Sequence, residues 1–378
     1  MKPSYERVQL HDRSQAKRKR PDIILPIVTL LLVTIGTVMI YSSSSILASE
    51  KFLDEYYFLK RQILFVLMGL AAMVALSKFP YRYWEKIAYA GIVLSILLLS
   101  LLLIPGWGVT AGGATRWLRI GGFTFQVTEV VKVALVIFLA HYMTKKIKHV
   151  KQFSRIFVIP LTVTAIIISL ILFQPDFGTS VIIVMVAMIM FYLAGSRVLH
   201  LIMLGSLFIP VGVVLILSES YRLKRWLSFI DPWKDPANSG FHIIQSFLSF
   251  GSGGTFGVGI GNGMQKLFYL PEPHTDFILS VIAEEGGFIG VSIVVVLFVI
   301  LIVRGFMISF SASDLFGTLL AAGLTIILVL EAFVNMAAVM GLIPTKGLVL
   351  PFLSYGGTSL LMSMMAIGII LNISSYRS

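Results

Sequence analysis

The sequence predicts an all-α membrane protein that crosses the bilayer about ten times. Hydrophobic residues make up 57% of the 378 positions and charged residues only 13%, whereas a soluble domain carries about 25% charged residues. The apolar residues lie in runs of roughly 20, the length that a helix needs to span hydrocarbon. The net charge of +12 is confined to short segments between those runs. These charges therefore indicate how the chain is oriented in the membrane and where it contacts anionic lipid. They do not indicate a nucleic-acid partner.

The chain divides into a basic tail and one membrane domain. Residues 1–22 form the tail, and residues 23–378 form a single domain of about ten spans. The first apolar run is too long for a signal-peptide core and has no cleavage site after it, so we expect it to be a retained anchor. The chain has no cysteine, which excludes disulfides, thiolate chemistry and cysteine zinc sites.

Ten segments are expected to span the membrane. They lie at about 23–43, 58–77, 86–104, 128–144, 156–173, 178–194, 198–217, 277–303, 315–341 and 352–374. The fifth and sixth are separated only by the turn at Gln174-Pro175-Asp176. No internal repeat is evident, so the sequence does not favour an inverted-repeat transporter.

The loops between these spans predict the orientation. Of the 30 lysines and arginines, 18 lie in the N-terminal tail and in the connections on the same side as it. Cytoplasmic loops carry the excess of basic residues, so both termini are expected in the cytoplasm. Three extracytoplasmic segments follow from this orientation, at about 105–127, 218–276 and 342–351. The large loop 218–276 holds enough aromatic and aliphatic residues to pack on the membrane face.

The strongest candidate for chemistry ends this large loop, in the run Leu270 to Phe277. Thr275 and Asp276 stand where a helix start needs hydrogen-bond acceptors, so capping is the simpler interpretation. Glu272 and His274 beside them favour a second one, because a cap does not need three ionisable groups within five residues. A general base beside a polar substrate accounts for all three.

Ionisable residues within spans form the next group of candidates. Glu129 and Lys132 are three residues apart and share a helical face. They form either a structural pair or, through Lys132, a contact for an anionic group. Glu284, Glu285 and Glu331 are expected to face the bundle interior, with structural and proton-relay roles both open.

Two outer segments are rich in glycine. The run 251–263 has seven glycines but no lysine-serine or lysine-threonine pair, so it does not match a nucleotide-binding loop. Close backbone approach or a hinge is the better interpretation. The segment 341–359 is interrupted by two prolines and four glycines, which predicts a broken helix or a re-entrant loop, and Lys346 is its sole charge. Arg116 and Arg119 in the first outer loop bind either phosphate or lipid headgroups, and base rates slightly favour headgroups.

These motifs resemble the SEDS family (shape, elongation, division and sporulation proteins). The resemblance covers nearly the full length. It is carried by residues 113–117, 125–129, 174–179, 270–277 and 344–359. Val127 departs from it, since the family commonly has proline there. The run Pro344 to Gly347 is most similar to the cell-division branch, with the sporulation and rod-shape branches as alternatives.

The resemblance implies the SEDS fold and a peptidoglycan glycosyltransferase that polymerises lipid II for septal cell-wall synthesis. Asp276 matches the family's essential aspartate and would act as general base. The departing pyrophosphate would be met by cations, for which Arg116, Lys132 and Lys346 are candidates, and by a divalent metal such as magnesium or manganese. The candidate substrate-binding residues are Arg116, Glu129, Lys132, Glu272, His274, Thr275, Lys346 and Ser354.

The resemblance also implies partners and a location. The partners are a class B penicillin-binding protein and other division proteins, at the septum of the bacterial cytoplasmic membrane. Two other functions stay open, a lipid II flippase and a non-catalytic scaffold of the division complex. The clustering of motifs on one face argues against alternating access, whose site lies near mid-membrane.

Overall fold

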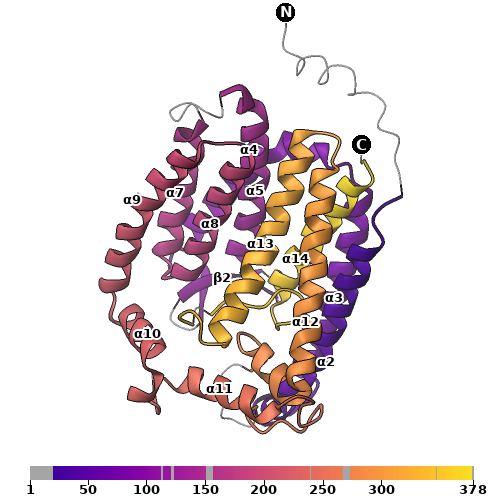
Figure 1. The fold of residues 1–378 in the computed structure, drawn as a ribbon, viewed down its shortest axis with the longest axis vertical. Helices are drawn as coiled ribbons and strands as arrows, with labels where there is room; N and C mark the ends of the chain where they lie inside the picture. Colours follow the sequence, from indigo (N-terminus) through magenta and orange to yellow (C-terminus); the bar gives the residue numbers. More distant parts are fainter. Residues whose placement is uncertain are drawn as a thin grey trace, which may run out of the picture.

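A bundle of long helices forms the molecule (Figure 1). The computed structural model describes residues 20–111, 114–120, 123–149, 156–238, 240–266, 273–345 and 347–376. Within these ranges, eight helices are long and apolar enough to cross a membrane, and two shorter apolar helices lie beside them. The polytopic helical fold is therefore confirmed.

The ten helices match the ten predicted spans in order. They are α2 (Ile24–Phe52), α3 (Tyr57–Lys78), α4 (Arg82–Leu101), α5 (Val127–Lys146), α7 (Val158–Leu172), α8 (Phe177–Leu193), α9 (Val198–Leu217), α12 (Ile278–Phe310), α13 (Leu315–Val339) and α14 (Gly357–Ser374). Helix α2 begins and α14 ends at one end of the bundle, which we call the terminal end (Figure 1). The opposite end, which we call the sheet end, carries the strands and the longest connection.

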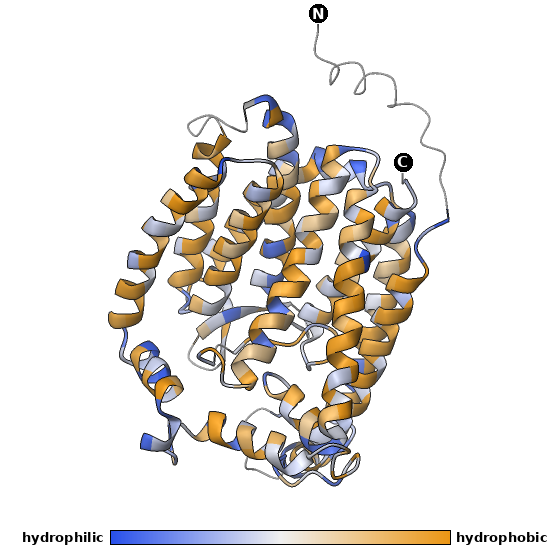
Figure 2. Ribbon diagram, in the orientation of Figure 1, coloured by the Kyte–Doolittle hydropathy of each residue, from blue (hydrophilic) through white to orange (hydrophobic). Residues whose placement is uncertain are grey.

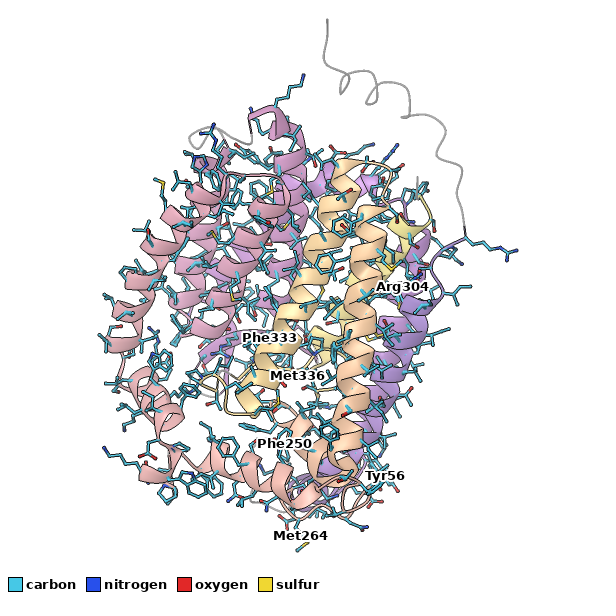
Figure 3. All side chains as sticks on the ribbon, viewed as in Figure 1. Tyr56, Phe250, Met264, Arg304, Phe333 and Met336 are labelled. Atoms are coloured by element: carbon cyan, nitrogen blue, oxygen red, sulfur yellow. The ribbon has the colours of Figure 1, made fainter. Side chains whose placement is uncertain are left out.

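Hydrogen bonds and an ion pair join three segments of the chain at the terminal end. The Arg304 guanidinium of α12 donates to the Asp22 carboxylate, and the Asp22 N–H donates to Ser374 Oγ of α14 at 2.9 Å. Figure 3 shows Arg304 near this end and Met264 at the other. The first, eighth and tenth predicted spans are thus joined where the chain enters and leaves the bundle.

The centre of the bundle is formed by α5, α13 and α14. In each, 83% of the most apolar window is buried, whereas only 6% is buried in α9. Hydrophobic residues run along most of the length of the helices (Figure 2), and α9 exposes many of them, such as Leu199, Ile202 and Leu207. Lipid is as apolar as these side chains, so an exposed apolar helix such as α9 is stable there.

Two helices run further than their apolar sequence predicts. Helix α2 continues from the predicted limit at 43 to Phe52, because serine hydroxyls bond to groups within the bundle, as Ser44 Oγ does to Ile40 O at 2.6 Å. Helix α12 continues past 303 to Phe310 because the Arg304 charge is paired. Hydrophilic residues marked these limits in the sequence, but the sequence did not show how they would be satisfied.

A three-stranded sheet at the sheet end was not predicted. Strands β1 (Gly108–Ala111), β2 (Ala114–Ile120) and β3 (Phe123–Gln126) pair antiparallel in the order β1-β2-β3. Leu118, which is buried, pairs with Phe125 across β2 and β3. The alternation of β-branched and aromatic residues suits strands, but the three runs are short. The sheet matters for the site because β2 carries Arg116 and β3 leads directly into α5.

The large loop is ordered, as its composition predicts. It contains α10 (Ser220–Ile230), the short helix η2 (Pro232–Lys234) and α11 (Phe241–Gly253), which cross the sheet end in Figure 1. Ser246 of α11 bonds to Ser280 Oγ at 2.8 Å and donates to Val339 O at 2.5 Å. Helix α11 is thereby fixed to α12 and α13. A further short helix, η1 (Ile147–His149), follows α5 at the terminal end.

The segment between α13 and α14 is an irregular re-entrant loop, with no helix among the described residues 340–356. It turns at Phe352, whose φ is 67°, and lies against α2 at Gly36. A Cβ atom at Gly36 would stand 2.6 Å from Leu353 Cα and 2.6 Å from Phe352 O. Only glycine on α2 allows this approach.

Replacing Gly36 is therefore expected to destabilise the fold. Gly36→Ala should lower the free energy of unfolding by about 1–3 kcal/mol, the usual cost of overpacking, and this should appear as a lower Tm in detergent. Gly205→Ala on α9 is the control, since nothing lies within 4 Å of that position. Equal Tm values for the two variants would contradict the close approach.

Candidate active site

Asp276 stands at the sheet end, just before α12. The helix begins at Ile278 with Phe277 at its N-cap position, so Asp276 lies one residue before the cap. The Asn335 amide of α13 donates to Asp276 O at 2.9 Å and to Leu348 O at 2.6 Å. One side chain thus joins the Asp276 segment to the re-entrant loop.

The re-entrant loop comes close to the Asp276 carboxylate. Gly347 has a φ of 64°, and a Cβ there would lie 3.3 Å from Asp276 Oδ2. Asp276 lines a small cavity of about 20 Å³ together with Asn335, Thr345 and Gly347. The carboxylate is therefore set against glycine backbone, where a larger residue would crowd it.

Two of the predicted site residues fix this loop in place. Ser354 Oγ donates to Thr275 O at 2.6 Å and accepts from Leu350 N at 2.8 Å. Tyr355 N donates to His274 O at 2.8 Å. Ser354, which is buried, and the Thr275 carbonyl hold the loop against the segment that carries Asp276. The motifs at 270–277 and 344–359 are thus joined in the folded chain through residues 274, 275, 354 and 355.

His274 is packed between aromatic rings. Its ring centroid lies 4.5 Å from that of Phe58 and 5.6 Å from that of Tyr355. Burial, aided by the Lys51 charge, lowers the pKa of His274 to about 4. The imidazole is neutral at pH 7, so it does not supply a positive charge to a substrate.

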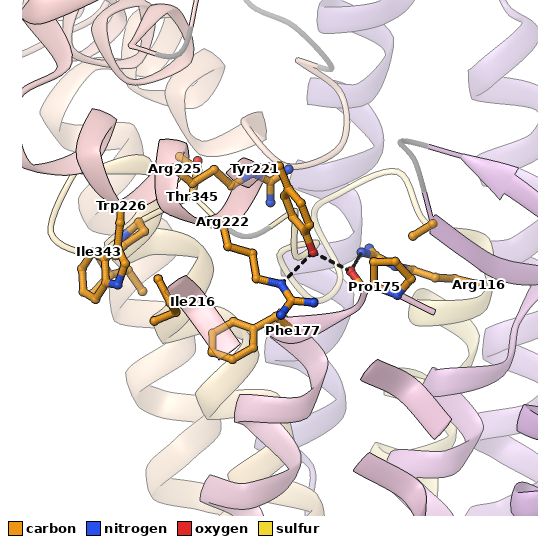
Figure 4. A pocket seen from close by; sticks show the side chains of 13 residues that line it. Arg116, Pro175, Phe177, Ile216, Tyr221, Arg222, Arg225, Trp226, Ile343 and Thr345 are labelled. Atoms are coloured by element: carbon orange, nitrogen blue, oxygen red, sulfur yellow. Dashed lines mark hydrogen bonds between the residues drawn. The ribbon is translucent and has the colours of Figure 1, made fainter. Parts of the chain in front are cut away.

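A cavity of about 650 Å³ opens beside the Asp276 cavity. It lies between β2, the start of α8, the end of α9, helix α10 and the re-entrant loop (Figure 4). Thr345 lines both cavities. We call the larger one the arginine pocket, because its lining includes Arg116, Arg222 and Arg225 beside the apolar side chains of Phe177, Ile216 and Trp226.

Hydrogen bonds order one side of the arginine pocket. Arg116 Nε lies 3.3 Å from Asp176 Oδ2, and Asp176 also caps α8 by accepting from Thr179 N at 3.1 Å. Arg222 Nε donates to Tyr221 Oη at 3.0 Å, and that hydroxyl reaches Pro175 O at 3.4 Å (Figure 4). Arg116 is partly neutralised by Asp176. Arg222 and Arg225 make no ion pair with a carboxylate within the described part of the chain, and so they keep their charge for a ligand.

Arg222 and Arg225 were not among the site residues predicted from the sequence. The sequence feature that could have indicated them is a tyrosine and two arginines within five residues of the large loop. Helix α10 places these three side chains along the arginine pocket. By contrast, Arg119 is exposed on β2 and does not line the pocket. Of Arg116 and Arg119, the two arginines of the first outer loop that were predicted to bind phosphate or headgroups, Arg116 lines the pocket and Arg119 does not.

Glu129 and Lys132 lie elsewhere, in the centre of the bundle. Lys132 Nζ donates to Glu129 Oε1 at 2.8 Å and also to the Glu331 carboxylate of α13. All three side chains are buried, and they line neither the arginine pocket nor the Asp276 cavity. This arrangement favours the structural pair over contact with an anionic group. Glu272 and Lys346 lie outside the described residues.

The lowered pKa of His274 predicts how stability depends on pH. Below pH 6.5 the unfolded chain binds a proton at this side chain, and the folded chain does so only near pH 4. Stability is therefore lost as the pH falls through this window, by about 3 kcal/mol at pH 4. The Tm of the native chain should fall more between pH 7.5 and 4.5 than that of His274→Phe. The same pH dependence in both would contradict a buried neutral imidazole.

Comparison with known proteins gives consistent matches over the whole membrane domain. The family model for FtsW, RodA and SpoVE, described as cell cycle proteins, matches residues 22–378. A probable peptidoglycan glycosyltransferase FtsW of Geobacter sp. strain M18 is 45% identical over 94% of this chain and 96% of its own length. Stage V sporulation protein E of Bacillus subtilis strain 168 is 42% identical over 95% and 98%.

Solved structures share the fold. A chain of a peptidoglycan synthase complex that coordinates polymerization and crosslinking superposes with a TM-score of 0.78 and 28% identity, over 94% of this chain and 97% of that one. The rod shape determining protein RodA of Thermus thermophilus gives a TM-score of 0.69 at 24% identity, over 94% and 97%. The chain therefore belongs to the FtsW, RodA and SpoVE family of cell cycle proteins, as the resemblance of its motifs predicts.

Proposed function

We propose that this protein is a peptidoglycan glycosyltransferase that polymerises lipid II, with Asp276 as general base. The observation that carries the proposal is the adjacency of the Asp276 cavity and the arginine pocket, which share Thr345. A sugar transfer from a pyrophosphate donor needs a base for the attacking hydroxyl and cations for the leaving group. The Geobacter relative, named as a probable peptidoglycan glycosyltransferase, supports the same activity.

The reaction requires one proton transfer in the protein. Asp276 takes the proton from the 4-hydroxyl of the acceptor sugar while that oxygen attacks the donor anomeric carbon. The bond from that carbon to the pyrophosphate oxygen breaks, and the configuration inverts. Pyrophosphate leaves as a stable anion, so no acid is needed to protonate it. Glycoside hydrolases, whose leaving groups are poor, use two carboxylates instead.

The arginine pocket suits the pyrophosphate and the first part of the lipid chain. Guanidinium groups bind phosphate oxygens through two parallel hydrogen bonds. Arg116, Arg222 and Arg225 supply these donors, and Phe177 and Trp226 supply apolar contact for hydrocarbon. We place Lys132 outside this role because its ammonium group is engaged by Glu129 and Glu331.

A divalent cation was expected at the pyrophosphate. Among the described residues, no three histidine or carboxylate side chains gather where a metal ion could sit. The described residues around Asp276 therefore do not offer the donor set of a dedicated metal site. A magnesium or manganese ion would enter, in this proposal, as a ligand of the substrate's own phosphates.

The location and partners follow from charge and similarity. We propose that the protein lies in the bacterial cytoplasmic membrane at the division septum, with the sheet end outside and both termini in the cytoplasm. The excess of lysine and arginine at the terminal end supports this orientation. The similar chain in a synthase complex that couples polymerization to crosslinking supports a crosslinking partner, which we propose to be a class B penicillin-binding protein.

Removing the Asp276 carboxylate tests the catalytic assignment. Loss of a general base costs about 10²–10⁴-fold in rate, so Asp276→Asn and Asp276→Ala should make glycan from lipid II at least a hundredfold more slowly. Asp54→Asn is the control, because it removes a carboxylate at the surface that contacts only its sequence neighbours Tyr56 and Lys60 in the described structure. Its rate should stay near that of the native chain.

Three outcomes of this experiment would overturn the catalytic assignment or the proposed function. Normal glycan yield from Asp276→Ala would show that Asp276 is not the general base. Movement of lipid II across a vesicle membrane by the native chain, without polymerisation, would favour the flippase instead. A chain that neither polymerises nor moves lipid II, yet still localises to the septum, would favour a scaffold.

Arg222→Ala is expected to weaken binding of lipid II. A hydrogen bond to a charged group is worth about 1.5–3 kcal/mol, so KM should rise roughly ten- to a hundredfold. Lys224→Ala is the matched control, since Lys224 is an exposed cation on the same helix that does not line the pocket. Equal KM values for the two variants would show that only the overall charge of α10 matters.

A further inference from the structure

Helix α12 is broken near its start. Gly287 has a φ of 63° and a ψ of −163°, which is far from helical. Residues 278–286 therefore form a short helical piece, distinct from the long piece 288–310. Asp276 precedes the short piece by two residues. The direction of that piece, and with it the placement of Asp276, depends on what holds the break.

The glycine loop, residues 254–266, fills the break. Its backbone exchanges four hydrogen bonds with the two pieces of α12: Val258 N to Glu284 O at 3.0 Å, Gly259 N to Glu285 O at 3.1 Å, Phe288 N to Gly254 O at 2.9 Å and Ile289 N to Thr255 O at 3.2 Å. These are backbone groups that an unbroken helix would have paired internally. Within or beside a membrane they need such partners.

Close packing explains Gly257 of this loop and Gly253 at the end of α11. A Cβ atom at Gly257 would lie 2.1 Å from Glu285 O, and one at Gly253 would lie 1.9 Å from Ala283 O. A Cβ at Gly287 would in turn lie 2.3 Å from Gly257 N. The two backbones touch without room for side chains. Of the two interpretations of the glycine run, the structure supports close backbone approach.

Buried charges fasten the glycine loop to α12. The Glu284 carboxylate accepts from Met264 N at 2.7 Å and from Gln265 N at 3.2 Å. Lys266 Nζ donates to Glu285 Oε1 at 2.6 Å and to Gly261 O at 2.8 Å. Glu284, Glu285 and Lys266 are 2%, 1% and 8% exposed. Charges this deeply buried are retained only when they are paired and hydrogen-bonded.

Helix α2 joins the same cluster. Ser42 Oγ donates to the Glu285 carboxylate at 2.7 Å, and Lys266 Nζ lies 3.0 Å from Ser42 Oγ. Glu285 also accepts from Gly261 N at 3.0 Å. The cluster thus connects the first span, the glycine loop and the short piece of α12. None of its members lines the arginine pocket or the Asp276 cavity.

We propose that Lys266 and Glu285 are positioning residues for Asp276. Lys266 anchors the chain ten positions before Asp276, and Glu285 anchors it nine positions after, so the pair fixes both ends of the segment that carries the base. The pair acts through the direction of the short helical piece and does not touch the substrate. The proposal rests on the role of Asp276 proposed above.

The test uses two measurements on the full chain with its partner. Lys266→Met should lower kcat for lipid II polymerisation by roughly ten- to a hundredfold, because a misplacement of about 1 Å can cost 10²-fold. KM should stay within about twofold, since the pyrophosphate pocket is not altered. Lys60→Met is the control, because it breaks an exposed pair with Asp54, and it should leave kcat unchanged.

The second measurement reports the loop itself. The chain has no cysteine, so spin labels can be attached at Glu50→Cys on α2 and Met264→Cys on the glycine loop, both exposed positions. A docked loop gives a narrow distribution of distances between the labels, and Lys266→Met should broaden it. Lys266→Arg keeps the cation and should restore both the narrow distribution and most of kcat. Ser42→Ala, which removes only one hydroxyl, should lower kcat more mildly than Lys266→Met.

The possible outcomes distinguish failure of the positioning role of Lys266 and Glu285 from failure of the proposed function. A broadened distribution with unchanged kcat would overturn the positioning role, and an unchanged distribution in Lys266→Met would overturn the anchoring, with the proposed function left standing. Failure of the native chain to polymerise lipid II, with a normal response of the distance distribution, would overturn the proposed function and the catalytic part of this inference together.

Discussion

Backbone hydrogen bonding in a medium with little water is the constraint on which this structure depends. Irregular backbone at the membrane face is stable only where side chains or other backbone satisfy its polar groups. Three irregular segments meet that condition here: the break at Gly287, the approach to α12 at residues 273–277 and the re-entrant loop. Asn335 and Ser354 bridge the second and third, and the glycine loop supplies partners for the first. The candidate active site lies where the second and third of these segments meet.

This constraint also explains how the segment that carries Asp276 is held. Asp276 stands on a loop, and loops in proteins are commonly mobile. Here the Thr275 carbonyl accepts from Ser354 of the re-entrant loop and the Asp276 carbonyl accepts from Asn335 of α13. A base that must meet a sugar hydroxyl within hydrogen-bond reach gains from such support, since the cost of ordering is met in folding and not in each turnover.

The features that could be predicted from the sequence are those that depend on composition and on the spacing of nearby residues. Ten apolar runs of membrane length gave ten helices, and Asp276 stood out because ionisable neighbours lie close to it along the chain. Three features depended on contacts between distant residues and were not predictable in that way. The sheet is built from three runs of only four to seven residues. Arg222 and Arg225 reach the pocket only after α10 has folded beside the start of α8. Glu285 finds Lys266 and Ser42 from two other parts of the chain.

The distribution of charge in the bundle favours a polymerase over a transporter. An alternating-access site needs polar groups at mid-membrane that are free to bind a substrate and then release it. The charges buried between α5 and α13, Glu129, Lys132 and Glu331, bind one another and so are not free to bind a substrate and release it. Arg222 and Arg225, which keep their charge, line the arginine pocket at the sheet end. The pocket pairs guanidinium donors with aromatic and aliphatic walls, so a free anion would use only its donors and a free hydrocarbon only its walls. A ligand with a pyrophosphate joined to a lipid chain uses both, and this is the chemistry that lipid II presents.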